Sequence, residues 1–476
     1  MGKHPRPSTQ RLRARTLASA AAIVLVAATS ALAAGVQKRE QPVRMAAAET
    51  TPSVASSAIV ATDVLVSRTG ELTRLSFALS GHVTPRAFVL ADPNRVIVDL
   101  PEVDFRIDPA VGRPVPEPAP KGRATPRRPA KAAAQPESRP LAGVVASFRF
   151  GRFAPGKSRV VVDLAEAARI VRLETEASPD GQGFRLVMEF ARTDAAAFAV
   201  AATEGRKASE IQTQAAVSGP AAANDARPTI VIDPGHGGID AGAHAGADTQ
   251  EKVIVFDFAK ALASRLGAAG RYRIVLTRDE DIFVPLSQRV KIARDAGAAL
   301  FISIHADTLS DAQSVSGATV YTVSDRASDA EAARVAENEN MADALGGLES
   351  KEDVSEVSDI LFDLTRRETR AYSHVFARTL VGYIKETAKL NKNPQRSAGF
   401  RVLKAPDVPS VLLELGYLSS DKDLAQLRNP EWREKAATSV ARAVDSFFAG
   451  RTSVQPAKTA GGSPEPAETG VARVIH

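Results

Sequence analysis

Residues 229–238 read TIVIDPGHGG, an apolar run that ends in a turn rich in glycine. Residues 300–307 read LFISIHAD, where a second apolar run also stops at a histidine. Both runs have the length and the apolar content of a buried β-strand. His236 and His305 therefore follow or end two strands, and both are expected at the carboxyl-terminal edge of one sheet.

Strand and helix patterns alternate from residue 228 to residue 449. Further apolar strand candidates lie at residues 273–277, 320–323 and 411–415. Helical stretches lie between them, for example at residues 250–266, 286–295 and 372–390. This alternation predicts an α/β domain with a mainly parallel sheet and helices on both faces. In such a fold, active residues gather at the carboxyl ends of the strands.

The preceding segment, residues 57–199, has a different pattern. Short runs rich in Val, Ile, Leu or Phe are separated by turn residues, without a convincing helix. These runs cover residues 59–66, 72–79, 87–90, 96–100, 144–150, 159–164, 170–174 and 184–190. They predict an all-β domain, a small sandwich. Residues 112–140 interrupt it with eight prolines, which favour an exposed, extended loop.

The remaining segments resemble processing and connecting sequences. Residues 1–33 contain five basic residues, a short apolar run and the small residues Ala-Leu-Ala, which predicts a secretory signal peptide. Its apolar run is too short to cross a bilayer, so no membrane span is expected after cleavage. We expect a flexible leader at residues 34–56, a linker at residues 200–227 and a disordered tail at residues 450–476.

Charge and cysteine content exclude several classes of protein. The formal net charge of +6 falls to about +1 once the five basic residues of the signal segment are removed. Residues 112–140 hold seven basic and two acidic residues, so the rest of the chain is slightly acidic and no basic face for nucleic acid is expected. The absence of cysteine excludes disulfides, a thiol nucleophile and a thiolate zinc site.

Four residues point to metal-dependent chemistry. Glu251 opens a helix behind Asp248 and Thr249, which resemble its N-cap. Together with His236 and His305 it offers three ligands of the kind that a catalytic zinc site uses, with the fourth position open. Glu414 lies in an otherwise apolar strand, where an ionised carboxylate is costly unless it is paired, and a raised pKa suits a general base.

Each of these residues also has a structural interpretation. A single buried histidine is more often a hydrogen-bonded core residue, and Glu251 alone fits a helix N-terminus. Glu414 alone fits an ion pair with Arg289. The glycine-rich turn alone fits a phosphate cradle, although the Lys-Ser or Lys-Thr of a P-loop is missing. Their convergence on one sheet edge favours the metal site.

Residues 228–449 resemble the catalytic domain of zinc-dependent N-acetylmuramoyl-L-alanine amidases. The matching pieces are residues 233–242, 251–252, 276–289, 303–307 and 412–419. The resemblance implies that His236, Glu251 and His305 bind Zn²⁺, that Glu414 is the catalytic base and that Arg289 is a candidate for substrate binding. Asp307 departs from the family pattern, which often has asparagine there. Residues 83–100 resemble, less specifically, the small wall-targeting β-sandwich that precedes such amidases.

A helical insertion at about residues 324–370 predicts a means of control. It is far longer than an ordinary connection, and it leaves the sheet soon after the His305 strand. We expect a carboxylate on it, Glu339 first and Glu337 second, to become a fourth zinc ligand and close the open position. The family resemblance implies a blocking helix of this kind, which a LytM-type activator protein moves aside.

The sequence therefore predicts a periplasmic zinc amidase that cuts peptidoglycan between N-acetylmuramic acid and L-alanine during daughter-cell separation. Two other functions remain compatible with the sequence. The first is a periplasmic zinc peptidase that acts on protein. The second is a non-catalytic protein that binds the cell wall. Neither nucleic acid nor a lipid bilayer is expected as a partner of the mature chain.

Overall fold

The computed structural model describes residues 58–114, 140–214, 225–246, 248–308, 315–348 and 360–452. The predicted signal peptide at residues 1–33 and the leader at residues 34–56 lie outside these ranges. So do residues 115–139 of the proline-rich loop and residues 453–476 of the predicted tail. Residues 450–452, where the sequence predicts the start of this tail, belong to the last helix.

The all-β region consists of two sheets that enclose one core. The five-stranded sheet contains, in spatial order, β5 (Val103–Phe105), β1 (Ile59–Thr69), β2 (Leu72–Leu79), β9 (Phe184–Arg192) and β8 (Ala168–Ala177). The four-stranded sheet contains, in spatial order, β3 (Arg86–Leu90), β4 (Arg95–Pro101), β7 (Lys157–Leu164) and β6 (Val145–Ala154). The short helix η1 (Pro109–Gly112) contacts the edge strand β6. Phe77 and Met188 of the first sheet pack with Val98 and Val162 of the second. The predicted small sandwich is confirmed.

Helix α1 (Ala195–Gln214) occupies part of the segment for which the sequence predicts a linker. Its run of alanines favours helix, and Phe198 and Ala202 lie four residues apart on one face. Both side chains are buried in the core of the sandwich. A Cβ added to Gly205 would lie 2.0 Å from the carbonyl oxygen of Val89, so α1 approaches β3 closely. The linker prediction is therefore wrong for residues 200–214.

The second region is built on a six-stranded sheet. Its spatial order is β13 (Arg273–Leu276), β10 (Thr229–Pro234), β14 (Ala298–His305), β17 (Ser410–Glu414), β15 (Ala318–Val323) and β16 (Leu390–Ala398). All neighbouring pairs are parallel except β15 with β17. The sheet is thus mainly parallel, as predicted. The edge strand β16 was not predicted, because residues 390–398 lack an apolar run.

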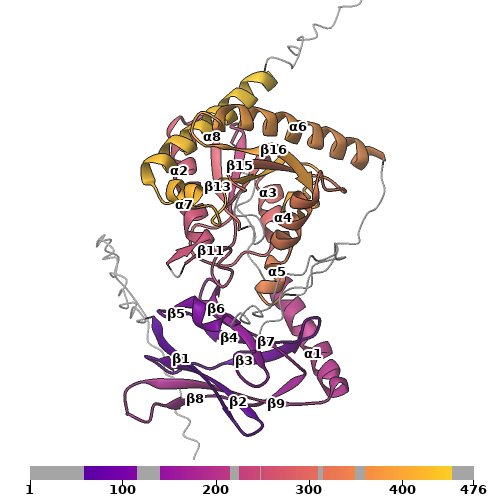
Figure 1. The fold of residues 1–476 in the computed structure, drawn as a ribbon. Coiled ribbons are helices and arrows are strands. Elements are labelled where there is room, and N and C mark those ends of the chain that lie inside the picture. The colour runs from indigo at the N-terminus through magenta and orange to yellow at the C-terminus, as the bar shows by residue number, and fades with distance from the viewer. Residues whose placement is uncertain are drawn as a thin grey trace, which may run out of the picture. The chain divides into compact units, whose positions relative to one another are not determined.

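Helices cover both faces of this sheet (Figure 1). On one face lie α2 (Glu251–Ala268), α6 (Ile360–Ile384) and α8 (Pro430–Thr452); on the other lie α3 (Leu286–Asp295) and α4 (Ala330–Asn340). Ile230 and Ile232 of β10 face the first layer and Val231 faces the second, because successive side chains of a strand alternate. The predicted α/β class is confirmed.

The remaining elements are short. They are β11 (His244–Ala245), β12 (Thr249–Gln250), α5 (Ala342–Leu345), η2 (Arg401–Leu403) and α7 (Asp421–Leu427). The helix expected at residues 372–390 begins earlier and ends at Ile384 as α6. None of the described helices is long and apolar enough to cross a membrane. By its internal contacts the chain from Ser57 onward is one compact unit, which includes the sandwich and the α/β region.

Candidate metal centre

The carboxyl ends of three adjacent strands bring the predicted site residues together. In the register of the sheet, Pro234 of β10 pairs with Ile304 of β14, and His305 pairs with Glu414 of β17. His236 lies two residues beyond the end of β10. Since neighbouring parallel strands end at one edge, these side chains share one site.

Glycines allow the two histidines to approach each other. His236 has a left-handed backbone with a φ of 56°, held within a tight turn in which Gly237 and Asp240 pair. A Cβ added to Gly235 would lie 2.4 Å from the imidazole of His305. A side chain at residue 235 would therefore displace that imidazole. The two rings lie edge to face with their centroids 4.9 Å apart.

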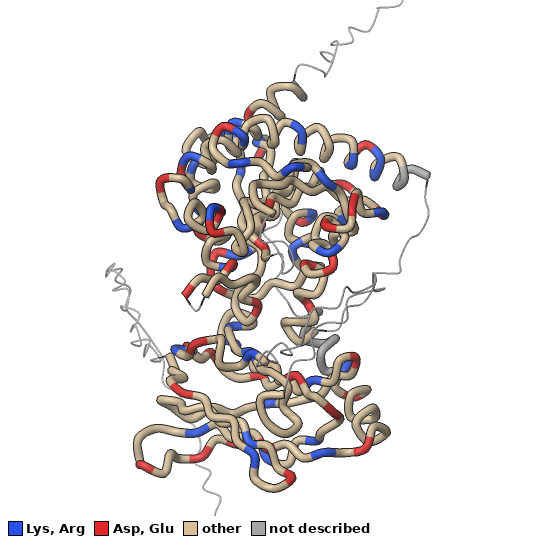
Figure 2. The backbone as a smooth tube through the Cα atoms, viewed as in Figure 1, with Lys and Arg blue, Asp and Glu red and all other residues tan. Residues whose placement is uncertain are grey.

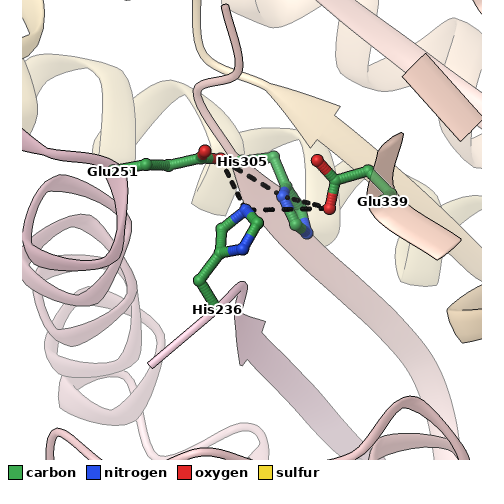
Figure 3. Close-up of side chains that lie close together, drawn as sticks. All are labelled: His236, Glu251, His305 and Glu339. Atoms are coloured by element: carbon green, nitrogen blue, oxygen red, sulfur yellow. Dashed lines mark ion pairs between the residues drawn. The ribbon is translucent and has the colours of Figure 1, made fainter. Parts of the chain in front are cut away.

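Two imidazoles and two carboxylates converge at this edge (Figure 3). The ligand atoms of His236, Glu251, His305 and Glu339 all lie within 4.8 Å of one another. Nε2 of His236 and Nδ1 of His305 lie 3.1 Å and 3.3 Å from Oε1 of Glu251. Oε2 of Glu339 lies 3.7 Å and 3.0 Å from the same two nitrogens.

These distances fit ligands around a metal ion. A tetrahedral zinc ion with bonds of about 2.0–2.1 Å holds its ligand atoms roughly 3.3 Å apart. Nε2 of His236 and Nδ1 of His305 are buried and make no well-aligned hydrogen bond with any other described residue. The four residues can therefore hold a metal ion.

The ligand side chains are oriented by groups behind them. Nδ1 of His236 lies 2.9 Å from Oδ2 of Asp240, which fixes the imidazole so that Nε2 points into the cluster. The two oxygens of Glu251 accept hydrogen bonds from the backbone N–H groups of Ala243 and Ala306, at 2.8 Å each. The N-cap of α2 is Gln250, without a side-chain hydrogen bond, so the predicted cap at residues 248–249 is wrong.

The carboxylates give this edge a strong negative field. Burial lowers the pKa of His305, but Glu339 and Glu251 outweigh burial and raise the pKa to about 10. For His236, burial is likewise outweighed by Asp240, Glu251 and Glu339, so the pKa lies well above its ordinary value. The same carboxylates would attract a divalent cation to the two imidazoles.

Glu414 lies directly beside the cluster and is fully buried. Its Oε2 accepts a hydrogen bond of 3.1 Å from the backbone N–H of Asp307, while Oε1 has no partner among the described residues. Burial raises the pKa of Glu414 well above its ordinary value; His305 opposes this rise and Asp307 adds to it. Burial, with Glu339 and Glu251 adding to it, also raises the pKa of Asp307 to about 8.

Arg289 is buried next to the site and supports the backbone that carries His236. It is 2% exposed and donates hydrogen bonds to Oδ1 of Asp233 at 2.7 Å and to the carbonyl oxygens of Pro234 and His236 at 2.8 Å each. Thr277 and Ser303 donate to the same Asp233 carboxylate. The predicted alternative, an ion pair of Arg289 with Glu414, is not formed. The guanidinium holds the turn that carries His236.

Helix α4 brings Glu339 to the cluster from the insertion. Its N-cap is Asp329, which accepts a hydrogen bond of 2.9 Å from the N–H of Ala332. Glu339 is 5% exposed, whereas Glu337 is exposed on the outer side of the same helix and does not join the cluster. A cavity of about 10 Å³, roughly one water molecule, is lined by Glu339, the two histidines and seven further residues.

Similarity to known proteins agrees with this geometry. A family model described as N-acetylmuramoyl-L-alanine amidase matches residues 230–446, and one described as an AMIN domain matches residues 63–120. The N-acetylmuramoyl-L-alanine amidase AmiC of Escherichia coli O6:H1 is 32% identical over 386 residues, which are 79% of this chain and 87% of that protein. The chain belongs to the N-acetylmuramoyl-L-alanine amidase family.

Two further amidases match about half of the chain. The amidase AmiA of Escherichia coli K12 is 39% identical over 220 residues, which are 46% of this chain and 75% of that protein. The structure of the amidase AmiC2 of Nostoc punctiforme covers 47% of this chain and 97% of its own, at 26% identity and a TM-score of 0.33.

Membership of the amidase family gives the reaction. The enzyme hydrolyses the amide bond between N-acetylmuramic acid and L-alanine in peptidoglycan, as the sequence predicts. The sequence did not predict the roles of two residues at this site, Asp240 and Asp307. Asp240, four residues after His236, is a recognisable second carboxylate for that imidazole. The backbone contact of Asp307 with Glu414 depends on the pairing of β14 with β17, which the sequence does not reveal.

Proposed function

We propose that this amidase uses one zinc ion, held by His236, Glu251 and His305, with Glu414 as the base. The observation that carries the proposal is the convergence of two imidazoles and a carboxylate at the strand ends, beside a buried carboxyl group with a raised pKa. Zinc suits a site of nitrogen and oxygen ligands. When bound, it supplies a Lewis acid for the amide carbonyl and for water.

The residues of the chain divide the remaining work. Glu414 takes a proton from the water molecule that attacks the carbonyl carbon. The C–N bond then breaks, and Glu414 returns the proton to the nitrogen of L-alanine. The products are a free amine on the stem peptide and a carboxylate on the lactyl group of the sugar. Asp240 and Arg289 hold His236 in place throughout.

We further propose that Glu339 is the fourth ligand of an inactive state. A catalytic zinc site needs an open position, and Glu339 lies where that position is expected. The cavity of about 10 Å³ beside it is far too small for a muramoyl peptide. Helix α4 must therefore move before the amidase can act. We assign that step to a LytM-type activator protein, as the family resemblance implies.

The location and the wall-targeting role belong to the same proposal. A signal peptide at residues 1–33 would deliver the chain to the periplasm, where peptidoglycan is the substrate. Residues 57–199, which include the AMIN match, would hold the enzyme on the wall at the division site, so that cleavage separates the daughter cells. The α/β region at residues 228–449 is the catalytic domain.

The test compares residues 34–476 with their Glu339→Ala variant on purified peptidoglycan. Mass spectrometry should find free stem peptides and intact glycan strands, released at least tenfold faster by the variant. Glu337→Ala is the matched control, because it removes an exposed carboxylate from the same helix. An unchanged rate in zinc-loaded Glu339→Ala contradicts the inhibitory role. Cleavage of casein without release of stem peptides selects the peptidase alternative.

A further inference from the structure

The four-stranded sheet of the sandwich has a second buried face. Along β4, Val96 enters the sandwich core, so Arg95 and Ile97 lie on the opposite face. Arg95 is 2% exposed there, and Arg159 of the neighbouring strand β7 is fully buried. Charged side chains are buried in this way only when other groups satisfy them.

Part of this satisfaction comes from the end of helix α5. Three arginines of this face, which we call the clamp face, donate hydrogen bonds to three successive backbone carbonyl oxygens. The pairs are Arg95 Nη1 with Ala344, Arg149 Nε with Leu345 at 2.6 Å, and Arg159 Nη1 with Gly346 at 3.1 Å. Carbonyl groups at the end of a helix lack intrahelical partners and carry partial negative charge, so cations bind them well.

The clamp face is organised by its own ion pairs. Asp99 binds Nε and Nη2 of Arg159 at 2.6 Å and 3.1 Å, and Asp163 binds Nη1 of Arg149 at 2.7 Å. The guanidinium of Arg159 also lies 3.5 Å from the ring centroid of Phe153. Each carboxylate leaves other guanidinium N–H groups for the carbonyl oxygens.

Apolar packing continues the contact beyond α5. Leu348 is 3% exposed and packs in one cluster with Ile97 and Val161 of the clamp face. Gly347 has a φ of 73°, and a Cβ added to it would lie 2.6 Å from Cδ1 of Ile97. The segment from α5 to Leu348 therefore fits this face closely.

This segment is continuous with the helix that carries Glu339. Met341 is both the C-cap of α4 and the N-cap of α5, so no flexible residue separates the two helices. We propose that the clamp face of the sandwich holds the end of α5, and that this contact keeps Glu339 in the metal centre. The inference rests on the inhibitory role proposed above for Glu339. The wall-targeting domain would then have a second role, which is to hold the inhibitory helix α4 in place through α5.

The test uses the full mature chain, loaded with zinc, and a soluble muramoyl peptide, so that attachment to the wall does not affect the rate. Arg149→Ala removes one charged hydrogen bond, which should raise the active fraction and the activator-free rate about tenfold. Leu348→Ser weakens the same contact from the other side and leaves the sandwich sequence untouched. Arg74→Ala is the control, because Arg74 binds Glu189 on the other sheet at 2.8 Å and should leave the rate unchanged.

Hydrogen exchange of the α4 amides provides an independent measurement. Exchange should accelerate in Arg149→Ala and in Leu348→Ser, and neither substitution should add to the rate of Glu339→Ala. If exchange in α4 is unchanged in both variants, the clamp is overturned, whatever the rates are. If exchange rises but Glu339→Ala has the wild-type rate, the clamp holds and the inhibitory role of Glu339 fails.

Discussion

Oε2 of Glu339 lies 3.0 Å from Nδ1 of His305, although α4 and β14 are separated by a strand and a long connection. The carboxylate is buried, and its helix also carries Ala332, Val335 and Ala336 into the domain core. The same helical face thus supplies both the packing of α4 against the core and the carboxylate that joins the His236, Glu251 and His305 cluster.

Loss of His305 should abolish metal binding. His305→Ala removes one of three ligands, so elemental analysis should find less than one tenth of the wild-type zinc content after dialysis. His374→Ala is the control, because this histidine is exposed on α6 and lies outside the cluster. Full zinc content in His305→Ala would remove the residue from the ligand set.

Asp240 should control zinc affinity without being a ligand. Asp240→Asn weakens the support of Nδ1 of His236, so the dissociation constant for zinc should rise by about 10–100-fold. Competition with a fluorescent chelator measures the change. Asp257→Asn, at a surface pair with Arg433, should have no effect. Equal affinity in both variants means that the Asp240 contact does not orient the ligand.

Glu414→Gln should remove turnover but not the metal. The side chain is nearly isosteric, so the buried site should keep its shape and its zinc. In the Glu339→Ala background, where the basal rate is high enough to measure, hydrolysis of peptidoglycan should fall about 100-fold or more. A rate within twofold of that background shows that the proton is accepted elsewhere.

Arg289 should affect stability as a positioning residue. Arg289→Met leaves the fully buried Asp233 without its cation, which should cost about 3–5 kcal/mol of unfolding free energy of the α/β region in urea. Arg294 lies on the same helix as Arg289 and forms an exposed pair with Asp407, so Arg294→Met should cost less than about 1 kcal/mol. A raised KM with unchanged stability would instead favour the substrate contact predicted from the sequence.

The sandwich should bind peptidoglycan without cutting it. A fragment of residues 34–215 retains the sandwich core together with α1. Once circular dichroism has shown it to be folded, it should sediment with insoluble peptidoglycan and release no stem peptides. A folded fragment that stays in the supernatant has no targeting role of its own.

The sequence predicts that His236, His305 and Glu414 lie together, because each follows or ends an apolar strand, and the register of the sheet confirms this shared edge. It also contains the signal that separates Glu339 from Glu337. Ala332, Val335, Ala336 and Glu339 repeat at helical spacing, so Glu339 continues the buried stripe and Glu337 cannot. The charge of the two side chains does not distinguish Glu339 from Glu337, because it is the same in both.

Other features depend on contacts that no local pattern encodes. Arg149 stands between Phe148 and Phe150, as a solvent-facing side chain of a strand does, yet it donates to the carbonyl oxygen of Leu345, 196 residues further along the chain. Along the described backbone, Lys and Arg are interspersed with Asp and Glu, so charge pattern alone does not mark the clamp face (Figure 2). Strand β16 could not be predicted from its own sequence either, because only its pairing with β15 identifies it as a strand.

The position of α4 in the chain affects how enzyme activity depends on the amount of enzyme that a cell makes. It lies between β15 and α6, so the proposed inhibitor is covalently tethered at both ends to the domain it blocks. Its local concentration is set by the tether and not by expression, so dilution cannot release it. Every copy of the enzyme is made with one inhibitor, and doubling synthesis doubles the latent pool without adding activity. Under the proposed inhibition, the supply of the proposed activator sets the amount of lytic activity in a cell.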